Sequence, residues 1–285
     1  MASGNMKAIK RRIKSVKSTK QITKAMELVA SSKQRKAKQR AENARPYFEA
    51  QYEMLNKIAQ GDGVGTSVFT KKREIKNRLF VVVAGDRGLA GGYNSNVFKM
   101  VAAECKDDTA KPKIIAIGKK TIDYFEKNGY DVIQKYPGFA ENLKVGYCSD
   151  IAVTAVNMFK GGEVDEVSIF YTTFVSSLQQ NPTKFKLVPV DTESDKGSKP
   201  ISLTDYDPSP EAVFERIIPQ FLLSIVFCAV CESYACEQSA RRIAMESATD
   251  NAQQMIEDLS LLYNRARQEK ITNEINEIVS GANAI

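Results

Sequence analysis

The glycine-rich stretch GDRGLAGGYN, residues 85–94, has the composition of a phosphate-binding loop. It lies between an apolar run and a helical pattern, where glycines let backbone N–H groups approach a phosphate at a helix N-terminus. Its spacing matches neither GxGxxG nor GxxxxGKS/T, and no acidic residue is clearly placed to bind a ribose. We therefore expect a structural turn in which Gly88, Gly91 and Gly92 allow close packing, with a dinucleotide-using α/β enzyme as the alternative.

Cys228 and Cys231 form a CxxC pair, the second group that could do chemistry. The chain has five cysteines, no second CxxC and no histidine, which argues against zinc and favours small apolar residues on a helix. The lack of histidine also removes the commonest general base and every Ser-His or Cys-His arrangement. Any catalysis would therefore have to use carboxylates, lysine, tyrosine or cysteine.

The middle of the chain, residues 75–192, alternates strand and helix patterns. RLFVVVAG (78–85) is an unbroken apolar run of buried-strand type, and further strand candidates are KIIAIG (113–118), EVSIFYTTF (166–174) and KFKLVPV (184–190). Helical patterns cover about 93–106, 119–128 and 149–160. This order predicts a Rossmann-like α/β domain with a largely parallel sheet that can turn antiparallel at its end.

Both ends of the chain, residues 1–60 and 209–285, have the pattern of a long helix. No glycine occurs between Gly4 and Gly61, and Pro46 marks an expected kink. The second helix has Ser209 as its expected N-cap and Pro210 at its first position. The two apolar stripes advance mostly by three or four residues: Ile9, Ile13, Val16, Thr23, Met26, Ala30, Ala37, Ala41, Ala44, Phe48, Leu55 and Ile58 in the first helix; Phe221, Ile225, Cys228, Met255, Leu259, Leu262 and Ala266 in the second.

Small residues suggest how these two helices are covered. Ala240, Ala244, Ala248 and Ala252 recur every four residues, so a second helix can approach closely. We expect residues 1–60 and 209–285 to form one antiparallel coiled coil, a shaft attached to the α/β domain. The alternative is two separate coiled coils with other chains.

The net charge of +7 is concentrated at one end of the chain. Residues 1–45 hold 14 Lys and Arg against two Glu, and the remainder holds 27 Lys and Arg against 32 Asp and Glu. Nucleic acid would favour such a segment, but no base-stacking aromatic residue lies between Lys7 and Arg45. A coiled-coil nucleic-acid-binding protein is therefore the less favoured alternative to an acidic protein partner.

Hydropathy predicts no transmembrane segment and no secretory signal. The longest strongly apolar run, FLLSIVFCAV at 221–230, has ten residues, against roughly 20 for a membrane-spanning helix. The start, MASGNMKAIKRR, is charged but has no apolar stretch behind it. We expect a cytoplasmic or matrix-like compartment.

Three segments together resemble the gamma subunit of the rotary F-type ATP synthase. They are IKRRIKSVKSTKQITKAMELVASSKQRKA near the N-terminus, GDRGLAGGYN, and EQSARRIAMESATDNA with YNRARQEKITNEINEIVSGANA near the C-terminus. The resemblance runs from about residue 6 to the end. It implies a non-catalytic central rotor shaft that couples ion-driven rotation to conformational change at the catalytic sites.

The resemblance also implies partners and a location. The shaft would turn inside an alpha3beta3 hexamer, one copy per complex, and its α/β domain would meet the epsilon subunit and the c-ring. It would be peripheral to the membrane on the cytoplasmic face of a bacterial cell. Contact residues are implied position by position: Lys24 and Met26 in the first helix, and Gln238, Arg241, Arg242, Glu246, Arg267 and Gln268 in the second.

Overall fold

The computed structural model describes residues 2–59, 67–71, 73–106, 111–176, 179–190 and 206–282. The described residues begin and end with two long helices, α1 (Ala2–Ala59) and α5 (Pro210–Ala282), and α1 continues through Pro46. The predicted cap is confirmed, because the Ala212 amide donates to Ser209 Oγ at 3.2 Å. That bond satisfies one of the free N–H groups at the helix start.

The predicted apolar stripe of α1 is confirmed, since each of its residues is buried or half-buried. On α5 the stripe prediction was wrong at Met255 and Leu262, which are exposed. Ile256 and Tyr263, each one residue further along, are half-buried instead. The reason is geometric, because a straight helix drifts by about 20° per heptad from a strict seven-residue repeat.

The two helices run antiparallel in each of two compact units. The first unit is Met1–Ala30 with Arg241–Ile285, and the second is Ser31–Ala240. In the first, the hydroxyls of Thr23 and Thr249 are hydrogen-bonded at 2.8 Å. In the second, Ser224 Oγ lies 2.9 Å from Gln51 Oε1. The three-part division expected from the sequence remains a prediction.

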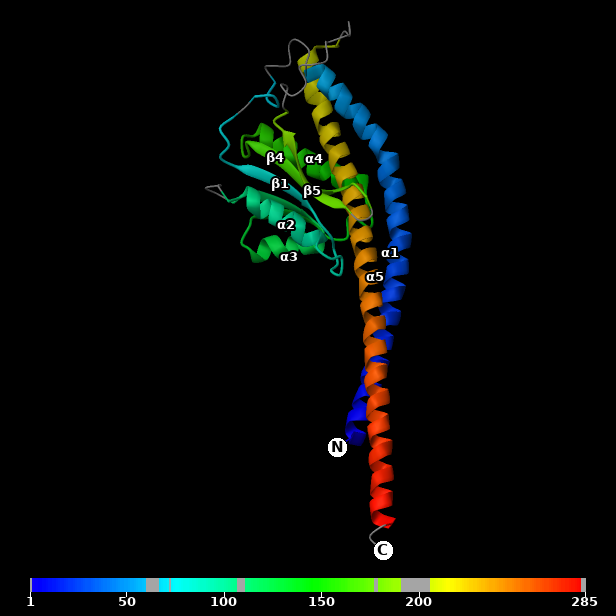
Figure 1. Ribbon diagram of the computed structural model, residues 1–285. Coiled ribbons are helices and arrows are strands. Elements are labelled where there is room, and N and C mark those ends of the chain that lie inside the picture. Colours follow the sequence, from blue (N-terminus) through cyan, green and yellow to red (C-terminus); the bar gives the residue numbers. More distant parts are fainter. Residues whose placement is uncertain are drawn as a thin grey trace. The chain divides into compact units, whose positions relative to one another are not determined.

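The second unit contains a five-stranded sheet of order β3-β2-β1-β4-β5 (Figure 1). β4 and β5 pair antiparallel, whereas the other neighbours are parallel, as predicted. The elements are β1 (Arg78–Val83), α2 (Tyr93–Glu104), β2 (Lys113–Ile117), α3 (Lys119–Lys127), β3 (Val132–Tyr136), α4 (Val145–Lys160), β4 (Glu166–Phe174) and β5 (Gln180–Val188).

β3 was missed by the sequence analysis because its segment, VIQKY, is only partly buried. It forms the edge of the sheet, so its residues do not form a continuous apolar run. Helices cover both faces of the sheet. Alternate residues of β1 pack with α2 and α3 on one face, and with α4 and the helices α1 and α5 on the other.

Helix α5 is long and apolar enough in one window to pass a length-and-composition test for a membrane span, with mean hydropathy 1.8. Half of that window is buried inside the protein. Leu222, Val226 and Val230 are at most 1% exposed and belong to the core on the α4 side of the sheet. These contacts are those of a core helix, and the expected lack of a transmembrane segment remains a prediction.

Candidate functional site

The glycine-rich loop at the end of β1 is hydrogen-bonded to the segments around it through the Gly85 backbone and the Asp86 side chain. The Gly85 amide donates to Asn94 Oδ1 at 2.8 Å, and the Lys120 amide donates to the Gly85 carbonyl at 3.0 Å. Asp86 Oδ1 accepts the amides of Lys119 at 2.9 Å and Gly138 at 2.7 Å. The loop therefore joins the ends of β1, β2 and β3, and the Gly85 amide is already bonded within the chain.

The glycines that packing requires are not the predicted ones. A Cβ at Gly88 or Gly91 would meet no heavy atom within 4 Å, although Gly91 has a positive φ of 54°. A Cβ at Gly85 would lie 2.9 Å from the Glu237 carboxyl group. At Gly118, with φ 96°, it would lie 2.2 Å from the Ala84 carbonyl oxygen. The expectation of close packing at Gly88 and Gly91 was wrong. The close approaches occur at Gly85, just after β1, and at Gly118, just after β2.

Gly92 is a milder case, because a Cβ there would lie 3.3 Å from the flexible Asn96 side chain. The predicted turn itself is present. Leu89 has a positive φ of 62°, and the Tyr93 amide donates to the Ala90 carbonyl at 3.2 Å as α2 begins.

The cysteines are structural thiols. Cys231 is buried and Cys228 half-buried on α5. Burial raises the pKa of both thiols, and that of Cys148, to about 12. A thiol with such a raised pKa stays protonated at neutral pH, and a protonated thiol is a poor nucleophile and metal ligand. Within the described residues no group of three or more potential ligands could hold a metal ion.

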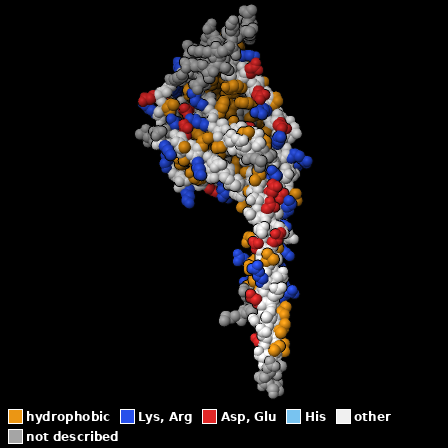
Figure 2. All heavy atoms as spheres, in the orientation of Figure 1, with side chains coloured by type: hydrophobic (Ala, Val, Ile, Leu, Met, Phe, Trp, Pro, Cys, Tyr) orange, Lys and Arg blue, Asp and Glu red, His pale blue; other side chains and the backbone are white. Residues whose placement is uncertain are grey.

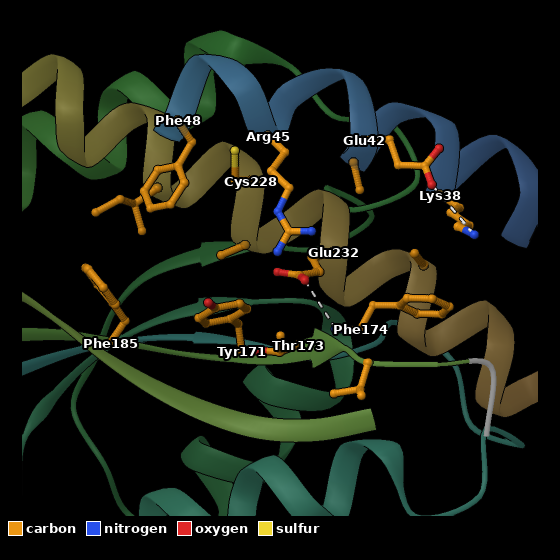
Figure 3. A pocket seen from close by; sticks show the side chains of 15 residues that line it. Lys38, Glu42, Arg45, Phe48, Tyr171, Thr173, Phe174, Phe185, Cys228 and Glu232 are labelled. Carbon is orange, nitrogen blue, oxygen red and sulfur yellow. Dashed lines mark hydrogen bonds and ion pairs between the residues drawn. The ribbon is translucent and has the colours of Figure 1, made fainter. Parts of the chain in front are cut away.

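A cavity of about 380 Å³ lies between α1, α5 and the strands β4 and β5 (Figure 3). Arg45 points into it from α1 and Glu232 from α5. Burial raises the pKa of the Glu232 carboxyl, while the Phe174 amide and the Arg45 guanidinium oppose the rise. Aromatic side chains form much of the remaining wall: Phe48, Tyr171, Phe174 and Phe185.

The sequence analysis missed Glu232, although a signal was present. It is a carboxylate directly after an apolar run on a helix, where a buried charge needs a partner. Its partner is the Phe174 amide, which donates to Glu232 Oε1 at 3.2 Å (Figure 3).

Most of the predicted contact residues lie in the first unit. Lys24 Nζ donates to the Glu27 carboxylate at 2.9 Å, and this bond and charge raise the pKa of Lys24, with smaller contributions from Glu246 and Asp250. Met26 is half-buried. Arg242 forms an ion pair with Glu246 at 3.0 Å. An exposed lysine and a partly exposed arginine are therefore held by local acidic residues.

The other predicted contact residues differ in exposure. Gln238 and Arg241 are 4% and 8% exposed, so they are largely enclosed by their own chain. Arg267 and Gln268 are exposed on α5. Exposure leaves Arg267 and Gln268 open to a partner, whereas Gln238 and Arg241 would act mainly through neighbouring side chains.

The last part of α5 carries an apolar stripe that lies beyond the residues of the predicted stripe. Every residue from Ile271 to Ser280 is exposed. Hydrophobic side chains are visible along this part of the helix (Figure 2). Four of them are large: Ile271, Ile275, Ile278 and Val279, with exposed fractions of 45, 54, 72 and 52%.

Comparisons with known proteins agree along the whole chain. A family model described as ATP synthase matches residues 5–285. An ATP synthase gamma chain from Ruminococcus albus is 50% identical over 281 residues, covering 98% of each chain. A gamma chain described as sodium ion specific, from Acetobacterium woodii, is 42% identical and covers 99% of each.

The fold also matches solved structures. A chain of the Euglena gracilis mitochondrial ATP synthase, in a structure of OSCP, F1 and c-ring, aligns with TM-score 0.70. The alignment covers 99% of this chain and 95% of that one, at 19% identity. At this identity the match concerns the fold.

Proposed function

The chain belongs to the ATP synthase gamma-chain family, and from this premise we propose how its surfaces serve the rotary enzyme. It is a non-catalytic subunit, the central rotor shaft of an F-type ATP synthase. It makes and breaks no bond itself. An asymmetric rod can favour a different conformation at each surrounding catalytic site, and this differential contact links rotation to nucleotide affinity.

The observation that carries the proposal is the apolar stripe Ile271, Ile275, Ile278 and Val279. Large exposed apolar side chains at helical spacing indicate a protein contact. We infer that this end of α5 turns inside an apolar sleeve formed by the alpha and beta subunits. Close packing without directional bonds lets the helix rotate there with little resistance.

We propose the further contacts as follows. Lys24 and Met26, with Gln238, Arg241, Arg242 and Glu246, lie where the shaft meets the moving levers of the ring. Arg267 and Gln268 contact a catalytic beta subunit. The sheet domain meets the epsilon subunit and the c-ring, with one copy of the chain per complex, on the cytoplasmic face of a bacterial membrane.

Reconstitution with purified alpha and beta subunits tests this function. We expect one copy of the chain per six-subunit ring by native mass, and stimulated ATP hydrolysis. Ile278→Asp should weaken assembly, because it introduces a charge into the apolar sleeve. Asn276→Asp introduces the same charge at another exposed position of α5 and serves as the control. If correctly folded partners form no complex with the unmodified chain, the proposed function is wrong.

A further inference from the structure

The end of β4 is bonded on one edge by side chains of α5. Along its first half, β4 pairs in parallel with β1, and the last partners are Val82 and Phe170. β4 continues to Phe174, four residues further, so its backbone groups on that edge need other partners.

Three side chains of α5 supply those partners. The Thr172 amide donates to Ser233 Oγ at 3.0 Å, and the Cys236 thiol donates to the Thr172 carbonyl at 3.5 Å. The Phe174 amide donates to Glu232 Oε1 at 3.2 Å. These α5 groups occupy the positions that a neighbouring strand would occupy in the sheet.

Two of the three hydrogen bonds of this joint are buried, and the bond between Phe174 and Glu232 is half-buried. Ser233 and Cys236 are fully buried, and Thr172 is 3% exposed. A buried hydrogen bond is costly to lose, because the freed donor cannot turn to water. The contact therefore resists sliding and twisting of the helix against the sheet more than apolar packing does, since hydrogen bonds depend steeply on direction.

We propose that Ser233 and Glu232 are positioning residues that fix the sheet domain to the shaft helix and so transmit torque between them. This inference rests on the proposed function as a rotor shaft. The bonds hold one angular position of the helix with respect to β4, whereas an apolar contact alone would allow small rotations. Loss of one bond leaves the shaft assembled but makes the joint softer.

Ser233→Ala tests the proposal, with Ser224→Ala as the matched control. Both serines are buried on α5, but the Ser224 hydroxyl faces Gln51 of α1 and not the sheet. Hydrogen exchange on the full chain comes first. We expect the Thr172 amide to exchange about fivefold faster in Ser233→Ala, the effect of losing one hydrogen bond of typical strength, and to keep its parental rate in Ser224→Ala.

The torque readout is the angular fluctuation of a probe attached at Lys127→Cys on α3, recorded in reconstituted alpha3beta3 complexes during catalytic pauses. Ser233→Ala and Glu232→Ala should widen the angular distribution at unchanged assembly and ATP hydrolysis, and Ser224→Ala should not. The proposal would be overturned if the angular distribution widened equally in Ser224→Ala, or if it kept its parental width in Ser233→Ala. Failure of the parental chain to assemble would instead contradict the shaft function, so the two failures are distinguishable.

Discussion

Single residues show where sequence patterns predict chemistry well and where they do not. The lack of histidine and the unmatched spacing of GDRGLAGGYN argued against a nucleotide enzyme. In the structure the Gly85 amide donates to Asn94, and the Asp86 carboxylate accepts the Lys119 amide. The need for glycine at Gly118 could not be predicted, because it depends on the carbonyl of Ala84, 34 positions earlier, lying 2.2 Å from the Cβ site. Contacts of that kind require the fold to be known.

Arg267 offers a direct test of a predicted partner contact. Its guanidinium can bond a carboxylate bidentately, a charged hydrogen bond worth about 1.5–3 kcal/mol. Arg267→Ala should therefore lower ATP-driven torque in single-molecule rotation, and Arg267→Lys should restore it only partly. Arg265→Ala, at another exposed arginine of the same helix, is the control. Unchanged torque in Arg267→Ala would count against the contact.

Glu232 predicts a dependence of stability on pH. Burial raises the pKa of its carboxyl in the folded chain, so the folded state binds a proton more tightly than the unfolded state. The resulting stabilisation is present below the unfolded pKa and is lost as pH rises through the folded pKa. The free energy of unfolding of Glu232→Gln, measured in urea, should therefore increase relative to the parent as pH rises through this range.

Glu53→Gln provides a control of opposite sign. Its hydrogen bond and ion pair with Lys57 lower the pKa of Glu53, so the parent gains stability as pH rises. The Glu53 variant should lose stability relative to the parent as pH rises from the lowered folded pKa to the unfolded pKa, a range that lies below the one for Glu232. A pH-independent difference for Glu232→Gln would show that burial does not control this carboxyl.

At the scale of elements, prediction succeeded where one physical signal was dominant. An unbroken apolar run identified β1, segments rich in apolar and β-branched residues identified β2, β4 and β5, and the lack of glycine over long stretches identified α1 and α5. The edge strand β3 lacks that signal. The joint between β4 and α5 could not be predicted either. In the sequence Ser233 is one of several small residues of a helix, and only the fold shows that it bonds Thr172.

The junction of β2 and α3 should tolerate no side chain at Gly118. Alanine there would need φ near 96° and would collide with the Ala84 carbonyl oxygen, at a cost of about 3 kcal/mol or more. Urea unfolding of Gly118→Ala measures this cost. Gly88→Ala, where a Cβ meets nothing within 4 Å, should change stability little. Similar losses in both variants would contradict the collision.

At the scale of the whole molecule, the uneven charge has a kinetic consequence. The basic residues are concentrated in residues 1–45. Opposite charges speed the encounter of two proteins, and salt screens them over about 10 Å at 0.1 M ionic strength. This reading was available from the sequence, because net charge does not depend on the fold.

The rate of association with the alpha and beta subunits should therefore fall as salt rises, and stopped-flow mixing can measure it. Replacing Lys7, Lys10, Arg11 and Lys14 with glutamine should flatten this dependence. The control removes equal charge from the sheet domain through glutamine at four exposed lysines: Lys99, Lys120, Lys127 and Lys144. If both sets flatten the dependence equally, only total charge matters.

The unbroken course of α5 from Pro210 to Ala282 gives the helix an angular phase. Each residue turns the helix by about 100°, so removing one residue between Thr249 and Ile271 would rotate the apolar stripe by that angle with respect to the threonine, which is bonded to Thr23 of α1. Removing seven would leave an error of only about 20°. In a rotary machine the length of this segment therefore sets the direction in which the apolar stripe faces. Deletion of seven residues should be tolerated, whereas deletion of one residue should not.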